Sequence, residues 1–255
     1  MTLLQRIGNL PLAKGDCVVA WLRPERIRDP QTIRDCERIL CADESVRYRR
    51  FLRETDRHRF LVAHALKRKL LGAILQRPPE SLEFTIDHLG KPDLSGRVPR
   101  EISFNLSHTT GLVACAVACT ETVGIDVEDC SRAIDIEVGR SVYSAAEMNA
   151  LRALSEREQP NRFFQLWTHK EAYSKARGLG FQLPMKQCEF HFSADQPVRA
   201  CFGGDVHDSP ERWWFVSRLI EPSHRCTLAI PITDVSSRPM EFQEFTELDL
   251  RTDSE

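Results

Sequence analysis

The order in which helical and strand-like patterns recur along the chain is the feature that most constrains its fold. Residues 54–76 carry apolar side chains at helical spacing, and Pro78-Pro79 ends the pattern. Residues 161–177 form a second long helical pattern. Strand-like runs flank both helices, at residues 16–22, 82–86, 102–107, 112–118, 123–128, 188–192, 198–202, 213–219 and 226–230. This order predicts an α+β fold, a pseudo-dimer of two similar α+β lobes in one chain.

Charge is distributed unevenly among the segments that this pattern defines. We assign residues 1–119 to an N-terminal lobe, 120–235 to a C-terminal lobe and 236–255 to an acidic tail. Residues 43–77 carry ten Lys or Arg against four Asp or Glu, whereas from Glu241 onward six acids accompany a single Arg251. The basic stretch either binds an anion or forms a solvated helix face, and the acidic block is typical of a solvated tail.

Composition and cysteine usage limit the classes of protein to which the chain can belong. Its 255 residues are 42% hydrophobic and 28% charged, as in globular domains, and the net charge of -2 indicates neither a nucleic-acid nor a membrane partner. The nine cysteines form no Cys-x-x-Cys pair, so we predict a reducing, cytoplasmic location. The N-terminus lacks the apolar region of a signal peptide. The uncharged stretch 102–120 contains Asn105, Ser107 and a turn, and these predict a hairpin rather than a membrane span.

A short strand-like segment, Gly124-Ile125-Asp126-Val127-Glu128, places two acids close together. Side chains alternate along a strand, so Asp126 and Glu128 share one face and Ile125 and Val127 the other. Neighbouring carboxylates repel one another unless a cation or water screens them, and their oxygens suit a hard ion such as magnesium. The segment taken alone is equally consistent with a solvated strand face.

The second long helix carries a stripe of chemically useful residues. Trp167, Glu171 and Lys175 are four residues apart and therefore lie along one side of the helix. The apolar side chains on this part of the helix would hold the stripe in place; they are Phe163, Phe164, Leu166 and Trp167. An ordinary surface Glu–Lys pair is the alternative interpretation of this stripe.

Two further polar segments precede the acidic strand. Ser107 and His108 are adjacent at the end of a strand, so they point to different faces and are poorly placed as a nucleophile and its base. Both can donate hydrogen bonds to phosphate oxygens, and Lys91, upstream in Gly90-Lys91-Pro92, can add a positive charge. A polar strand end followed by a turn is the alternative.

The succession GKP, FNLSH, GIDVE and WTHKEAYSK resembles the 4′-phosphopantetheinyl transferases of the larger, single-chain type. A Gly-(Ile/Val)-Asp-x-Glu strand and a (Phe/Trp)-(Ser/Cys/Thr)-x-Lys-Glu-(Ala/Ser)-x-x-Lys helix identify that family, and both are complete here. The resemblance extends over residues 43–230 and leaves the first forty residues and the tail outside.

The resemblance implies an activity and a role for each residue. The enzyme would transfer the 4′-phosphopantetheine arm of coenzyme A to a serine of an apo acyl, peptidyl or aryl carrier protein and release 3′,5′-ADP. Magnesium would bridge the pyrophosphate and be held by Asp126, Glu128 and Glu171. Glu171 is also the candidate base, Lys175 would stabilise charge on the phosphates, and Lys170 would either assist catalysis or brace the site. Further contacts to coenzyme A are expected from Arg47, Arg59, Lys91, Ser107, His108 and Lys175.

Two other classes of protein remain as alternatives at this point. A metal-dependent phosphohydrolase can also place two acids on a strand and a third on a helix, and a coenzyme A- or carrier-binding module could share the fold without catalysis. The complete helix signature favours the transferase. The family further implies a monomer, and Arg132 and Arg140 are candidate contacts to an acidic carrier protein.

Overall fold

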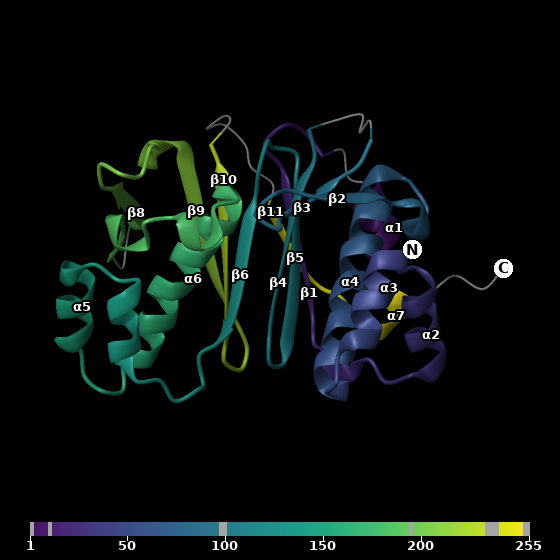
Figure 1. Cartoon of the computed structure of the whole chain (residues 1–255), viewed down its shortest axis with the longest axis horizontal. Coiled ribbons are helices and arrows are strands. Elements are labelled where there is room, and N and C mark those ends of the chain that lie inside the picture. The colour runs from purple at the N-terminus through teal and green to yellow at the C-terminus, as the bar shows by residue number, and fades with distance from the viewer. Residues whose placement is uncertain (1–2, 10–11, 97–100, 194–195, 233–239, 252–255) are drawn as a thin grey trace.

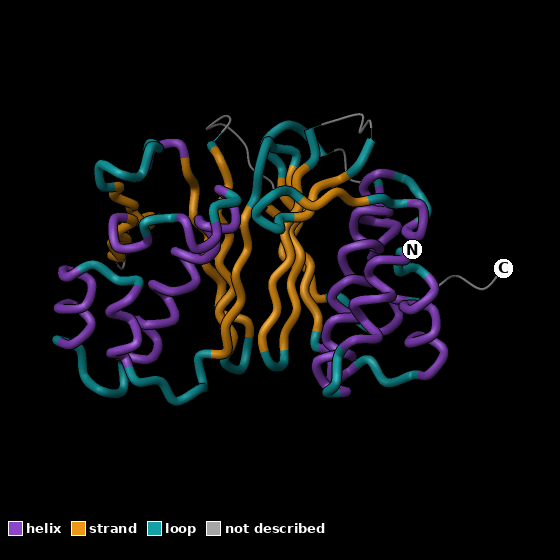
Figure 2. Tube along the Cα trace, in the orientation of Figure 1, coloured by secondary structure: helices purple, strands orange, loops and turns teal. Residues whose placement is uncertain are grey.

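Two β-sheets lie face to face at the centre of the protein, and helices cover the outer face of each sheet (Figure 1, Figure 2). This computed structural model describes residues 3–9, 12–96, 101–193, 196–232 and 240–251. The first sheet has the order β11-β1-β5-β4, and its strands are β11 (Met240–Glu244), β1 (Cys17–Leu22), β5 (Leu112–Ala118) and β4 (Ser103–Thr109). The second has the order β6-β10-β9, with strands β6 (Gly124–Asp129), β10 (His224–Pro231) and β9 (Trp213–Ile220).

Each sheet has its own set of helices and one small hairpin. The first sheet is covered by α1 (Leu3–Gly8), α2 (Pro30–Arg38), α3 (Ala42–Arg50), α4 (Glu54–Leu75) and α7 (Glu247–Leu250), and the second by α5 (Ala145–Arg152) and α6 (Gln159–Arg177) (Figure 1). The hairpins are β2 (Phe84–Ile86) with β3 (Pro92–Leu94), and β7 (Cys188–Ser193) with β8 (Gln196–Phe202). Within the described ranges, no helix is long and apolar enough to cross a membrane.

Alternating side chains on the central strands build three apolar cores. On β1, Val18 and Ala20 pack under α4, whereas Cys17 and Val19 face the second sheet. A third core lies between the second sheet and α6. Because β1 and β5 are buried on both faces, they read as continuous apolar runs in the sequence rather than as alternating ones. The two sheets therefore form a single four-layer stack.

The predicted α+β fold with two lobes is confirmed. The helix predicted at residues 54–76 is α4 and the helix predicted at 161–177 is α6, each within two residues of the expected ends. A capping box begins α5, because the Ser144 hydroxyl accepts from the Glu147 backbone N–H and the Glu147 carboxylate accepts from that of Ser144. Helices α1, α2 and α3 were not predicted.

The expectation of a solvated tail is wrong for the described part of residues 236–255. Strand β11 pairs in parallel with β1, and Phe245 and Leu250 are buried in the core beneath α4. The Glu247 carboxylate accepts hydrogen bonds from the backbone N–H groups of Arg28 and Asp29 at 2.7 and 2.6 Å. The acids of this segment are interspersed along the sequence with buried apolar residues that fix the segment to the first sheet. Its net charge alone therefore did not show whether it packs against the protein.

Candidate active site

The two carboxylates of β6 face helix α6, at the place where the two sheets meet. Ile125 and Val127 point the other way, into the core between the sheets, as predicted from strand alternation. A Cβ atom added to Gly124 would lie 2.0 Å from the carbonyl oxygen of Ala172. The missing side chain at residue 124 therefore lets the α6 backbone lie directly against the acidic face of β6.

Lys175 of α6 links the acidic strand to β4. Its ammonium donates to Asp126 Oδ1 at 2.6 Å and to Ser107 Oγ at 2.9 Å. The Ser107 hydroxyl also donates to Asp126 Oδ1 at 3.1 Å and accepts from the Val127 backbone N–H at 3.2 Å. One hydroxyl, one ammonium and one carboxylate thus meet at the junction of the two lobes, and all three belong to the predicted site.

The three predicted metal-binding carboxylates carry poorly compensated negative charge. Burial raises the pKa of Asp126, although Lys175 opposes the rise. Burial and the nearby Asp126 raise the pKa of Glu128 to about 6, and the same two causes raise the pKa of Glu171. Asp126 Oδ2 is buried and has no hydrogen-bond partner among the residues that the structure describes. Such a buried oxygen costs free energy unless a cation or a donor reaches it, so the residues present fit a hard divalent ion.

No group of three or more His, Cys, Asp or Glu in the described ranges is already arranged to hold a metal ion. Lys175 occupies the charge-compensating place beside Asp126 instead, at the 2.6 Å distance given above. Arg132 similarly reaches Glu128, with its Nη2 atom 2.7 Å from Oε2. Binding a metal ion would therefore require small side-chain rearrangements at these two contacts.

Positive groups gather next to the carboxylates, on the side of the N-terminal lobe. His108 is exposed on β4, and partial burial of its ring together with the charges of Arg59 and Lys175 lowers its pKa. Arg59 lies on α4 and pairs with Asp56 at 3.3 Å. The guanidinium of Arg47, on α3, lies 5.6 Å from the centre of the Phe60 ring, which follows Arg59 in sequence. Three of the predicted phosphate contacts, Arg47, Arg59 and His108, thus come from the neighbouring elements α3, α4 and β4, which we call the basic face.

Lys91 lies between the lobes, at the C-terminal end of α6. Its ammonium donates to Thr122 Oγ1 at 2.9 Å and to the carbonyl oxygen of Ala176 at 3.1 Å. The turn that carries Lys91 is closed by Asp87, whose carboxylate accepts from the Lys91 backbone N–H, and by Gly90 at a φ of 89°. Lys91 lines a cavity of about 420 Å³ between this turn and the end of α6.

Lys170 does not join the other predicted catalytic residues. Its buried ammonium lies 2.8 Å from Glu147 Oε2 and donates to the carbonyl oxygens of Met185 and Cys188 at 2.7 and 2.5 Å. These contacts tie α6 to α5 and to the segment that enters β7. The position of Lys170 supports the bracing role that was one of its two predicted roles and gives no support to a catalytic one.

Two residues to which the motifs assigned no role also shape the site. Asn105 accepts a hydrogen bond from the Ile125 backbone N–H at 3.0 Å, and Thr109 donates to Glu128 Oε2 at 3.4 Å. Asn105 and Ser107 project from the same face of β4, so the alternation along that strand was the available signal. Their side chains join the free edge of β6 to the N-terminal lobe.

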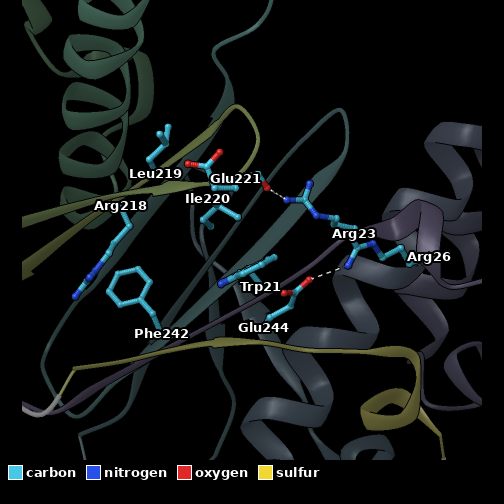
Figure 3. Close-up of a pocket in the computed structure, with 9 residues that line it drawn as sticks. All are labelled: Trp21, Arg23, Arg26, Arg218, Leu219, Ile220, Glu221, Phe242 and Glu244. Carbon is cyan, nitrogen blue, oxygen red and sulfur yellow. Dashed lines mark hydrogen bonds and ion pairs between the residues drawn. The ribbon is translucent and has the colours of Figure 1, made fainter.

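Two more cavities differ in their relation to the carboxylates. One, of about 610 Å³, is bordered by Glu171 and by the apolar side chains of Trp167, Leu183 and Met185. The other, of about 370 Å³, lies between the edge strands β9 and β11, whereas β4 and β6 are the opposite edges of the two sheets (Figure 3). Trp21, Arg218 and Phe242 line this second cavity. The 610 Å³ cavity therefore adjoins the candidate site and the 370 Å³ cavity does not.

A cluster of acids beside basic side chains, set between two lobes, is typical of an enzyme that acts on a phosphate-containing substrate. Comparison with known proteins identifies which enzyme class this is. A family model described as "4'-phosphopantetheinyl transferase superfamily" matches residues 122–229, and a second, described as "4'-phosphopantetheinyl transferase, N-terminal", matches residues 29–120. The chain belongs to the 4′-phosphopantetheinyl transferase family, and it is an enzyme that transfers phosphopantetheine to carrier proteins. The family recognised from the motifs is confirmed.

Individual relatives extend this match along almost the whole chain. The 4′-phosphopantetheinyl transferase HetI of Nostoc sp. is 30% identical over 241 residues, which are 93% of this chain and 96% of HetI. Sfp of Bacillus subtilis is 31% identical over 69% of this chain and 75% of Sfp. The solved structure of Thermotoga maritima holo-[acyl-carrier-protein] synthase has a TM-score of 0.35 and 18% identity, and covers 43% of this chain and 62% of that one. The family match thus begins well before residue 43, where the motif resemblance began.

Proposed function

We propose that this enzyme moves the 4′-phosphopantetheine arm of coenzyme A onto a serine of an apo acyl, peptidyl or aryl carrier protein, releases 3′,5′-ADP and requires Mg²⁺. The observation that carries the proposal is the buried, unpartnered Asp126 Oδ2 beside two further carboxylates with raised pKa values. Asp126, Glu128 and Glu171 would hold the ion. When bound, Mg²⁺ would neutralise the charge that develops on the pyrophosphate during attack.

The side chains around the acids account for binding of the phosphates. Lys175 reaches both Asp126 and Ser107, so its ammonium can donate to a phosphate oxygen placed between β4 and α6. His108 can donate a hydrogen bond to a phosphate oxygen, and Arg59 adds positive charge from α4. Arg47, on α3, would meet the 3′-phosphate. Lys91 would border the adenine end. Orientation and charge stabilisation of this kind supply most of the catalysis in phosphoryl transfer.

Glu171 is suited to accept the proton of the attacking serine. Its raised pKa makes it a better base than a free carboxylate, provided that it stays ionised at the working pH. The cavity of about 610 Å³ that Glu171 borders is lined by side chains of the C-terminal lobe. The pantetheine arm would lie toward that cavity once the phosphates are held.

The remaining assignments follow from the same interpretation. We take the enzyme to be a cytoplasmic monomer whose lobes comprise residues 1–119 and 120–235, with residues 240–251 returning to the N-terminal lobe. A phosphohydrolase or a non-catalytic binding module, the two alternatives left open by the motifs, finds no support from HetI and Sfp, both of which are named 4′-phosphopantetheinyl transferases.

Binding of Mn²⁺, followed by electron paramagnetic resonance, tests the metal site without relying on turnover. Asp126→Asn and Glu128→Gln should each weaken binding by about tenfold or more. Asp129→Asn is the matched control, because Asp129 is the next acid on the same strand and bonds to Ser131 and Ser223 instead. Equal Mn²⁺ affinity in all three variants would contradict the proposed ligand set.

A further inference from the structure

A single buried carboxylate, Glu44, joins the two helices that carry the basic face. Its Oε1 lies 2.8 Å from His64 Nδ1 and accepts from Lys67 Nζ at 2.6 Å, and its Oε2 accepts from Arg68 Nε at 2.5 Å. Oε2 also accepts from the backbone N–H of Cys41 at 3.1 Å, at the start of α3. Glu44, Lys67 and Arg68 are all buried. The Glu44 side chain of α3 is thereby bonded to three side chains of α4, those of His64, Lys67 and Arg68.

The same cluster extends to the hairpin that carries Lys91. Arg68 Nη1 donates to the carbonyl oxygens of Pro79 and Leu82 at 2.8 and 3.0 Å, in the connection between α4 and β2. The Lys67 ammonium lies 3.7 Å from the centre of the Phe84 ring, on β2 itself. Glu44 therefore stands at the junction of the three elements that supply Arg47, Arg59 and Lys91.

The charges of this cluster fix its geometry. Burial alone would raise the pKa of Glu44, but the hydrogen bond with His64 and the charge and hydrogen bond of Lys67 hold it well below its usual range. Burial lowers the pKa of His64 to about 4, so at neutral pH the ring is uncharged. The buried charges of Lys67 and Arg68 are then both balanced by the single carboxylate of Glu44, and its removal would leave both charges without a counter-ion. The charged contacts that Glu44 makes with Lys67 and Arg68, which hold α3 against α4, would be lost as well.

Arg47 depends directly on where α3 lies. It is three residues beyond Glu44, and it contacts Phe60, whose ring stacks on His64 with centroids 4.0 Å apart. Displacement of α3 would move Arg47 relative to Arg59, whereas Ser107, Lys175 and the carboxylates belong to other elements and would stay in place.

We propose that Glu44 is a positioning residue for the 3′-phosphate of coenzyme A, acting through Arg47; the inference rests on the proposed function. The test compares kcat and KM for coenzyme A with those for 3′-dephospho-coenzyme A. Glu44→Gln should raise KM for coenzyme A about tenfold, the loss of one charge-assisted contact, and leave KM for the dephospho compound and both kcat values within about twofold. Equal changes for the two substrates, or a loss confined to kcat, would overturn the proposal.

Matched variants separate this effect from general destabilisation and from failure of the proposed function. Asp35→Asn removes another buried acid of the same lobe, one that pairs with Arg38 at 3.1 Å, and should lower the melting temperature without changing the preference for coenzyme A. If Glu44→Gln does not fold, Lys67→Met keeps the Glu44–Arg68 pair and should shift the preference in the same direction; an unchanged preference there overturns the proposal.

The dependence on Arg47 is tested by a double-mutant cycle. Arg47→Gln alone should reduce the preference for coenzyme A, and adding Glu44→Gln should then reduce it little further. Additive losses would show that Glu44 does not act through Arg47. Full preference in Arg47→Gln would instead overturn the assignment of Arg47 to the 3′-phosphate, which is a failure of the proposed function at that residue.

Discussion

Replacing Gly124 by alanine should separate the fit of α6 against β6 from the chemistry of the acids themselves. The new Cβ would lie 2.0 Å from the Ala172 carbonyl oxygen, 2.4 Å from Ala176 N and 3.0 Å from Ala176 Cα. Ordinary contacts between such atoms are about 3.5 Å, so the helix has to retreat by on the order of 1 Å. Glu171 and Lys175 would move with the helix, away from Asp126.

The magnitudes follow from that retreat. Overpacking of this kind costs about 1–3 kcal/mol, and each kcal/mol lowers the melting temperature of a chain of this size by about 2–4 °C. A displacement of about 1 Å at the reacting groups lowers kcat/KM about 100-fold. Transfer would be measured well below the melting temperature of the variant, with Gly204→Ala as the control, because a Cβ there meets no atom within 4 Å. Full activity in Gly124→Ala would refute the tight apposition of α6 and β6.

Two further predictions concern stability. Burial and the nearby Asp126 raise the pKa of Glu128 to about 6, so this carboxylate binds a proton more tightly in the folded protein than in the unfolded chain. Ionised Glu128 therefore destabilises the folded protein increasingly as pH rises from about 4.5 to about 6. In metal-free buffer Glu128→Gln should therefore stabilise the protein by up to about 2 kcal/mol at pH 7.5 and by nothing at pH 4, as followed by thermal denaturation; a constant gain at both pH values would contradict this origin. Lys170→Met should lower stability by about 3 kcal/mol, because Glu147 is left buried without its partner, while KM for coenzyme A stays the same. A raised KM with unchanged stability would argue for direct contact with substrate.

The main elements of the fold could be predicted because hydrophobic periodicity determines them locally. The spacing of apolar residues in α4 and α6 gave both helices, and strand alternation placed Ile125 and Val127 opposite the acids. Strand β11 could not be found in this way. Its pairing with β1 joins residues more than two hundred positions apart, and its acids obscured the apolar residues that hold it.

Local sequence patterns predicted part of the site and missed the part that depends on how the elements pack. The motif placed Lys170 and Glu171 together, but consecutive residues on a helix point about 100° apart, so one faces the acids and the other faces α5. Asp126, Ser107 and Lys175 meet as expected. The cluster around Glu44 combines residues twenty or more positions apart and depends on how α3 lies against α4, which no local pattern determines.

The most direct test of the metal-dependent mechanism is intact-protein mass spectrometry of an apo carrier protein incubated with this enzyme, coenzyme A and Mg²⁺. We predict a gain of one phosphopantetheine arm with the wild-type enzyme and with Asp129→Asn. The gain should be lost in EDTA and with Asp126→Asn, whose side chain holds the unpartnered oxygen. Transfer that persists in EDTA, or at the wild-type rate with Asp126→Asn, would contradict the role given to the carboxylates of β6.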